Sequence, residues 1–393
     1  MNIFELVLFH APIKANICTT TERMVRLMVE NRLKLCIILM TFVFSSGQMV
    51  WFFYRWYNNH DMEYACNYAP ILFTCFFAAI SIIQVALKHS HFRKSIAFIR
   101  ENFWSQDLAT EEARNEMSDK IGYIKLLNVS TVSLTAIAAF VFMPFNGIHY
   151  NQTLFPFMDF LGNLDMPEGL KKCLAILIYP LMFPTTYCVA ILGVALCFYA
   201  CNFKAQAIMI KWLILDITKD LETSNNQFDI LDDIKRQEII KNRLITCIKH
   251  HNKLCRFAKL MQGYFYYTMI WHVLGVITLS ASIIYMIFFQ NTTPSNQLAI
   301  FLECIILAFG TYMYCFMGES FQGQFEDVFD ATKEAKWYYF NVKNRKLFSI
   351  FIMNLRRSYK LDCAGIFCMN LELTIWILNK IFALVSVLTA MKE

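Results

Sequence analysis

AGIFCMNLELTIWILNKIFALVSVLTAM, residues 364–391, is the last apolar run of the chain. About 20 apolar residues are enough for a helix to cross a bilayer, so this run predicts a membrane span. Most membrane helices exclude charged and strongly polar side chains, yet Glu372, Asn379 and Lys380 lie within it. We therefore expect one side of this helix to face something other than lipid.

Wound at about 100° per residue, the run separates into two sides. One wedge of the helix gathers Glu372, Trp376, Asn379, Lys380, Ala383, Ser386, Val387, Ala390 and Met391. The opposite side gathers Phe367, Leu371, Ile377, Leu378, Ile381, Phe382, Val385 and Leu388. An ionisable group inside a span costs about 2.5–3.5 kcal/mol and is tolerated where it faces water, a partner or a cavity. The wedge is therefore a candidate pore or cavity lining. Alternatively, Glu372 lies near the interface and Lys380 extends towards it or meets a polar partner on another helix.

The composition of the whole chain excludes an ordinary soluble domain, because 57% of its 393 residues are hydrophobic and only 17% are charged. Apolar runs predict spans at about 35–54, 69–87, 126–145, 173–200, 264–289, 298–317 and 364–391. The predicted fold class is an all-α, polytopic membrane protein with seven transmembrane helices. An odd number of spans places the two termini on opposite sides of the membrane.

The distribution of Lys and Arg predicts which terminus is cytoplasmic, because short loops rich in these residues stay inside. Residues 1–35, 88–125, 202–262 and 319–362 hold 5, 7, 11 and 8 of them, which is 31 of the 36 in the chain. The N-terminus is therefore expected in the cytoplasm and the C-terminus outside. The net charge of +6 follows from this distribution and indicates no nucleic-acid partner.

The loops that this topology places outside contain two N-glycosylation acceptors, Asn151 and Asn291. Cys66 and Cys173 fall near outer helix ends; they could form a disulfide, although two separate free thiols are the favoured interpretation. The charged stretch 107–120 predicts a solvated helix between the second and third spans. Pro180 and Pro184 predict a bend in the fourth span.

No catalytic motif, metal-ligand cluster or cofactor-binding loop is present in the sequence, so neither an enzyme nor a cofactor is predicted. The outer halves of spans two, three, four and six are rich in aromatic and small residues, the usual lining of a small-molecule site. The candidate ligand-binding residues are Phe73, Phe76, Phe77, Thr135, Ala138, Phe142, Met182, Phe183, Tyr187 and Leu302. Ordinary core packing is the competing interpretation. Three interpretations of Glu303 stay open, contact with a ligand, with a cation or with interfacial water, and interfacial water is the favoured one. His272 is expected to be a packing residue.

The C-terminal third resembles the insect odorant receptor family. The resemblance rests on YMYCFMGESFQGQFEDVFDATKEAKWYYF at 312–340, in which Gly318, Val328, Ala331 and Trp337 match the family's spacing. LRRSYK at 355–360, AGIF at 364–367 and HHNKLCRFAKLMQGYF at 250–265 add to it. The chain lacks the Gln-Lys-Pro that often follows the paired basic residues in this family. It also lacks the TYxxxxxQF signature of the related gustatory receptors.

The resemblance implies a ligand-gated, non-selective cation channel of four subunits, with a pore lined by the second part of the last helix. It implies a small volatile odorant as ligand, the odorant co-receptor as partner, monovalent and divalent cations as permeant ions, membrane lipid around the protein, and the plasma membrane of an olfactory neuron as location. The implied pore and gate residues are Lys380, Ala383, Ser386, Val387, Ala390 and Met391, with the narrow gate at Val387 and Met391.

Together these patterns predict an organisation along the chain: a cytoplasmic segment (1–34), spans one to four with an outer-half pocket (35–200), a cytoplasmic helical extension (201–263), spans five and six (264–318), cytoplasmic anchor helices (319–363) and a pore-lining last span (364–393). Two other functions stay open. A transporter of a small apolar solute would need broken helices around a midplane site, and a gustatory-type receptor channel belongs to the same superfamily. A G-protein-coupled receptor is excluded by the predicted orientation.

Overall fold

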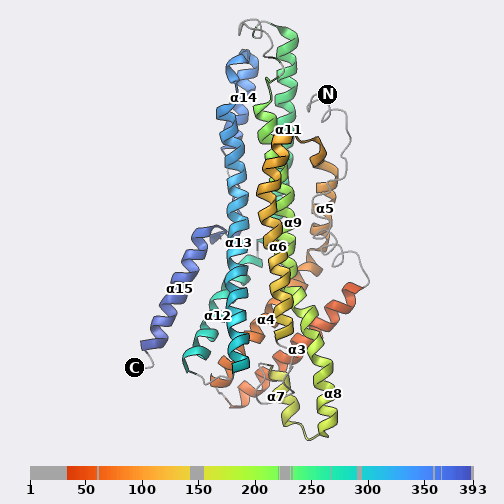
Figure 1. Cartoon of the computed structure of the whole chain (residues 1–393), viewed down its shortest axis with the longest axis vertical. Helices are drawn as coiled ribbons and strands as arrows, with labels where there is room; N and C mark the ends of the chain where they lie inside the picture. Colours follow the sequence, from red (N-terminus) through yellow and green to blue (C-terminus); the bar gives the residue numbers. More distant parts are fainter. Residues whose placement is uncertain are drawn as a thin grey trace.

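The computed structural model describes residues 33–59, 62–141, 155–219, 221, 231, 233–266, 268–289, 294–356, 359–363 and 365–390. Most of them form long helices that run side by side along the longest axis of the molecule (Figure 1). The predicted all-α class is confirmed. A short two-stranded hairpin before the last helix is the one addition to it within this part of the chain.

Each of the seven predicted spans corresponds to a helix. These helices are α3 (Leu33–Asn59), α4 (Met62–Leu87), α6 (Glu111–Val141), α9 (Met182–Leu215), α12 (Thr268–Phe289), α13 (Pro294–Glu334) and α15 (Leu371–Ala390). Among the described residues, three helical stretches are long and apolar enough to cross a membrane: Glu111–Phe140, Glu168–Leu215 and Ile300–Glu334. A fourth candidate span consists of two helical stretches bent by 45° relative to each other, Ile234–Phe265 and Met269–Ile284.

The other elements connect or extend these spans. They are α5 (His89–Asn102), η1 (Gln106–Leu108), α7 (Pro156–Asn163), α8 (Glu168–Ile178), η3 (Tyr179–Leu181), α11 (Ile234–Phe265), η4 (Trp337–Tyr339) and α14 (Val342–Leu355). In the fourth span, for which Pro180 and Pro184 predicted a bend, the 3₁₀ turn η3 at Pro180 joins α8 to α9, and Pro184 lies in the first turn of α9. At η3 the missing N–H of Pro180 tightens the helix rather than ending it.

Two predicted boundaries were wrong. The charged stretch 107–120 is not a separate helix, because α6 begins at Glu111 and continues without a break into the third span. In the last apolar run the helix begins only at Leu371, because β1 (Asp362–Cys363) and β2 (Phe367–Cys368) pair as an antiparallel hairpin before it. Gly365 has φ +72° at its tip, a conformation that glycine adopts without strain.

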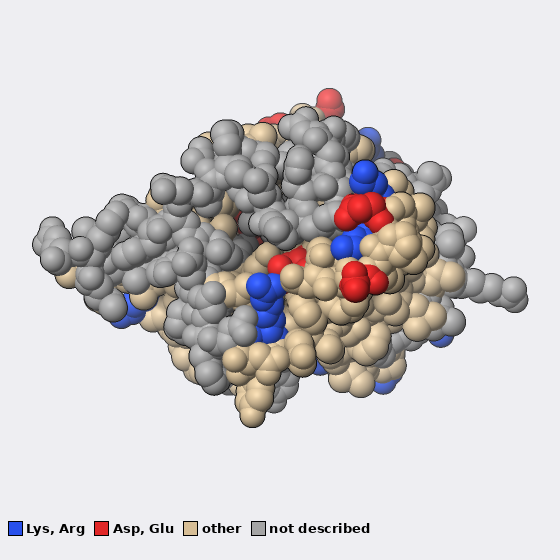
Figure 2. Space-filling model, turned by 90° about the horizontal axis from the view of Figure 1, so that it is seen from below, with Lys and Arg blue, Asp and Glu red and all other residues tan. Residues whose placement is uncertain are grey.

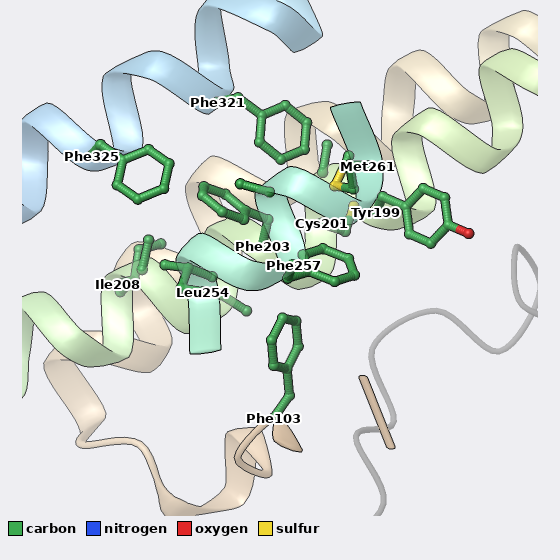
Figure 3. Close-up of a cluster of buried hydrophobic side chains, with 14 of the residues drawn as sticks. Phe103, Tyr199, Cys201, Phe203, Ile208, Leu254, Phe257, Met261, Phe321 and Phe325 are labelled. Atoms are coloured by element: carbon green, nitrogen blue, oxygen red, sulfur yellow. The ribbon is translucent and has the colours of Figure 1, made fainter. Parts of the chain in front are cut away.

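Helix α9 forms the centre of the bundle. It contacts α3, α4, α6, α11 and α13, and its side chains are buried around almost its whole circumference. A helix that is apolar on all sides is stable only when other helices surround it. Figure 3 shows one part of this core, where Phe203 of α9, Phe257 of α11 and Phe321 of α13 lie together.

A second cluster fixes α7 to α3. Asp159 of α7 is 7% exposed, and its carboxylate accepts hydrogen bonds from Arg55 and from the indole N–H of Trp51, the latter at 3.2 Å. The Arg55 guanidinium also lies 5.0 Å from the ring centroid of Tyr64 in α4. One buried carboxylate therefore joins three elements at the end of the bundle opposite α11.

We expect Asp159→Asn to destabilise the protein by about 1–3 kcal/mol, because it leaves the Arg55 guanidinium without a charged partner. Thermal unfolding of the detergent-solubilised protein measures the loss. Glu168→Gln is the matched control, since its side chain is 68% exposed and its oxygen is 4.0 Å from Lys171 Nζ. Equal melting temperatures for both variants would show that the Asp159 cluster contributes nothing to stability.

Candidate ligand cavity and the exposed last helix

A cavity of about 150 Å³ lies among α4, α6, α9, α12 and α13. Most of its lining is apolar. Small residues on three of these helices make room for it: Gly193 on α9, Gly275 on α12 and Gly310 on α13. A methyl group on Gly193 would lie 2.7 Å from Met313 Cε, whereas the other two glycines have open space where a Cβ would stand. The missing side chains at Gly275 and Gly310 therefore contribute to the volume.

The structure gathers six of the ten predicted ligand-binding residues around this cavity: Phe73, Phe77, Thr135, Ala138, Met182 and Leu302. Three others lie elsewhere. Phe76 is 42% exposed and packs edge-on against Trp271, Phe183 is 37% exposed beside Phe140, and Tyr187 packs against the main core. Phe142 lies outside the described residues.

Glu303 departs from its expected place. Instead of meeting interfacial water, it is 9% exposed and lines the cavity from α13. The Thr74 hydroxyl donates to its Oε1 at 3.3 Å. His272 lines the cavity from α12, where its ring lies 4.4 Å from that of Tyr314, and its Nε2 has no hydrogen-bond partner among the described residues. The cavity thus holds an acid and an imidazole that sequence reasoning did not assign to it.

Helix α15 leaves the bundle and extends away from the other helices (Figure 1). Only the side that carries Leu373 and Ile377 is buried, against Val273, Val276 and Cys315. On the predicted wedge, Glu372, Trp376, Asn379, Lys380, Ala383, Ser386, Val387 and Ala390 are all exposed. Met391 lies outside the described residues.

The opposite side of α15 was only partly as predicted. Ile377 and Ile381 pack on neighbouring helices, whereas Leu378 and Phe382 are 47% and 67% exposed. The Nζ of Lys380 lies 5.4 Å from the ring centroid of Trp376, one turn earlier on the wedge. A single chain therefore leaves both the polar wedge and an apolar stripe of α15 uncovered.

The base of α15 is held against α13 by close backbone contact. Gly318 of α13 faces the residue that follows β2, and an ideal Cβ at this position would lie 2.1 Å from the carbonyl oxygen of Met369. Met369 is itself fixed, because its N–H donates to Leu361 O at 2.8 Å. The Asn370 side chain accepts from Leu373 N at 3.0 Å and caps the helix. Glycine at 318 is thus required by the approach of another backbone.

Within the described part of the chain, no three His, Cys, Asp or Glu side chains are grouped so as to hold a metal ion. Cys173 is an exposed free thiol. The predicted glycosylation acceptors Asn151 and Asn291 lie outside the described residues.

These features define a polytopic membrane protein built on long helices, with an internal apolar cavity and an exposed final helix. The chain belongs to the 7tm odorant receptor family, whose model matches residues 61–382. Comparison with curated protein sequences gives no match.

Two solved structures share the fold over nearly their whole length. One is the insect olfactory receptor OR5 from Machilis hrabei, with a TM-score of 0.72 and 11% identity, covering 98% of this chain and 95% of that one. The other is the same receptor in complex with eugenol, with a TM-score of 0.69 and 11% identity, covering 99% and 96%. The similarity to these structures agrees with the predicted fold.

Proposed function

We propose that this odorant receptor is a subunit of an odorant-gated, non-selective cation channel that assembles with the odorant co-receptor. The observation that carries the proposal is the cavity between α4, α6, α9, α12 and α13, which has the composition of a small-molecule site. An apolar cavity of about 150 Å³ accepts a benzene-sized molecule. A related receptor has been solved with eugenol, which supports a small volatile ligand.

The route from ligand to pore that we propose runs along α13. This helix is 41 residues long, lines the cavity from Leu302 to Tyr314, and contacts the base of α15 at Gly318. Tyr314 and Gly318 are separated by about 6 Å of helix. Suppose that α13 has two placements in the bundle and that α15 moves with it. A ligand that binds more tightly to one placement then shifts the equilibrium between the two by its difference in binding free energy.

In this proposal the wedge of α15 lines the pore, with Lys380, Ala383, Ser386, Val387, Ala390 and Met391 along it. Its support is that the wedge is exposed in a single chain, so that other subunits are needed to cover it. The exposed apolar residues Val342, Ile350 and Met353 of α14 support assembly through the predicted anchor helices.

We propose that the N-terminus is cytoplasmic and that Asn151 and Asn291 lie outside, in a multi-pass protein of the plasma membrane. The support is the small number of Lys and Arg in the predicted outer loops. Seen from the end where α7 and α8 lie, the described surface is mostly uncharged, with only scattered basic and acidic side chains (Figure 2).

The direct test is to record odorant-evoked current in cells that express this chain with and without the co-receptor, against a panel of volatiles. We expect cation current for a subset of compounds and only when both subunits are present. Uptake of a volatile without current would instead favour the transporter.

The second test of the proposal is a substitution at Val387, the residue proposed to form the gate. Val387 is 57% exposed in a single chain, and a ring of apolar side chains blocks ions by excluding water. We expect Val387→Ser to raise the basal current of the heteromer severalfold. Leu378→Ser is the control, because Leu378 lies about 180° around the helix from Val387. Equal basal currents for both variants at equal surface density would remove Val387 from the gate.

A further inference from the structure

The cavity contains an acidic side chain whose hydrogen-bonding capacity is only partly used. Glu303 is 9% exposed, and among the described residues the one hydrogen bond it accepts is from Thr74, at 3.3 Å. An ionised carboxylate has about four acceptor positions. Leaving such a group in an apolar site without partners is costly, so the remaining positions favour a donor that enters with the ligand.

Neither a basic side chain nor the hydroxyl groups of three other threonines around the cavity compensate Glu303. Among the described lining residues there is neither lysine nor arginine. The hydroxyl groups of Thr131, Thr135 and Thr186 donate to backbone carbonyls of their own helices, at 2.8, 3.0 and 3.0 Å. Their donor protons are therefore already used. His272 also lines the cavity, with its Nε2 unpaired among the described residues, but Glu303 is the one acid among the described lining residues, and substitution at Glu303 separates its effect from that of the imidazole.

We infer that this receptor selects compact ligands that carry a hydrogen-bond-donor head, an amine or a hydroxyl, and that Glu303 accepts the hydrogen bond from this head. The inference rests on the proposed function and adds the chemical class of the ligand. The hydrocarbon body of the ligand lies against the aromatic and aliphatic wall that includes Phe73, Phe77 and Leu302. The size of the cavity limits this body to about that of a benzene ring.

Both kinds of head fit the same carboxyl group. If Glu303 is protonated when a neutral amine enters, its proton moves to the amine nitrogen, and the product is an ammonium–carboxylate pair. If Glu303 is ionised, it pairs with an ammonium ion directly. A hydroxyl donates its O–H to the carboxylate without transfer of a proton. An ether or a hydrocarbon of the same size leaves the acid desolvated and adds no donor to the hydrogen bond from Thr74.

The experiment measures half-maximal concentrations for matched sets of four compounds, an amine, an alcohol, a methyl ether and a hydrocarbon, on benzyl, cyclohexyl and butyl skeletons. The full chain is expressed with its co-receptor. We expect amines and alcohols to act at concentrations roughly 5- to 150-fold lower than the ethers, which is the effect of leaving one buried polar group unpaired.

Two substitutions at Glu303 distinguish the response to amines from the response to alcohols. Glu303→Gln keeps an acceptor without charge, so it should weaken the response to amines and preserve the response to alcohols. Glu303→Leu removes the acceptor and should abolish the preference for donors while ethers and hydrocarbons still activate. Glu334→Gln and Glu334→Leu are the matched controls, since Glu334 is an exposed acid at the other end of α13 and should leave the ranking unchanged.

Responses led by ethers or hydrocarbons in the unmodified receptor would overturn the inference and leave the proposed function standing. So would an unchanged ranking of the compounds in Glu303→Gln. If Glu303→Leu does not reach the cell surface, the contrast between amine and alcohol in Glu303→Gln still decides the question. If no compound of the three sets evokes a current, the inference is wrong. If no volatile of the wider panel evokes a current either, the result also contradicts the proposed function.

Discussion

Gly318→Ala is expected to abolish ligand-evoked current and to lower the thermal stability of the protein. The new methyl group would lie 2.1 Å from Met369 O and 2.6 Å from Met369 Cβ. A flexible side chain could rotate away, but the nearest atom belongs to backbone that is hydrogen-bonded to Leu361. The hairpin and the first turn of α15 must therefore move off α13, which breaks the contact that joins the cavity to α15.

The size of this effect follows from overpacking, which costs about 1–3 kcal/mol and sometimes more. Gly323→Ala is the control on the same helix, because nothing lies within 4 Å of the position its Cβ would take. There, alanine should be neutral or stabilising by up to about 1 kcal/mol. The two variants are compared by thermal unfolding, surface labelling and current. Normal current and normal stability in Gly318→Ala would show that the base of α15 tolerates displacement.

The identity of the spans could be predicted from hydrophobicity, whereas the start of the last helix could not. Residues 364–370 are as apolar as the helix that follows, so hydropathy extends the span over them. Gly365 and Asn370 were the available signals, because glycine permits the left-handed turn of the hairpin and asparagine caps a helix. Neither residue is decisive without knowledge that Met369 packs on Gly318.

The cavity could be predicted in part. Phe73 and Phe77 are four residues apart on α4 and share one face, so both reach the cavity. Phe76 lies one position before Phe77 and points about 100° away, towards Trp271 and the surface. Composition alone cannot distinguish these three side chains. The face that points inward depends on how α4 packs against α9 and α12, which no single helix encodes.

Glu303 was misplaced for a related reason. A lone acid near the end of an apolar run is ordinarily assigned to the membrane interface, where water hydrates it. Here Thr74 of α4 donates a hydrogen bond to it, and the neighbouring helices cover it. A hydroxyl on a different span is a partner that sequence spacing does not reveal.

Lys380→Thr is expected to raise the cation conductance of the heteromer. Lys380 lies on the exposed wedge of α15, two turns before Val387, and its Nζ is 5.4 Å from the ring centroid of Trp376. At about 6 Å and an effective dielectric constant of about 40, a lysine repels a monovalent cation by roughly 1.4 kcal/mol, a tenfold effect on its local concentration. A heteromeric ring carries fewer such charges than four copies of this chain, so this chain alone should conduct poorly.

Single-channel recording measures the conductance, and surface biotinylation measures assembly in the same cells. Lys343→Thr is the control, because Lys343 is an exposed lysine of α14 and lies outside the proposed pore. In the competing arrangement, the Lys380 side chain turns towards a polar group on a neighbouring subunit. Its cation–π contact with Trp376 contributes only about 0.5–1 kcal/mol, too little to prevent this turn. In that arrangement Lys380→Thr loses surface protein and keeps its conductance, a result that would remove this lysine from the ion pathway.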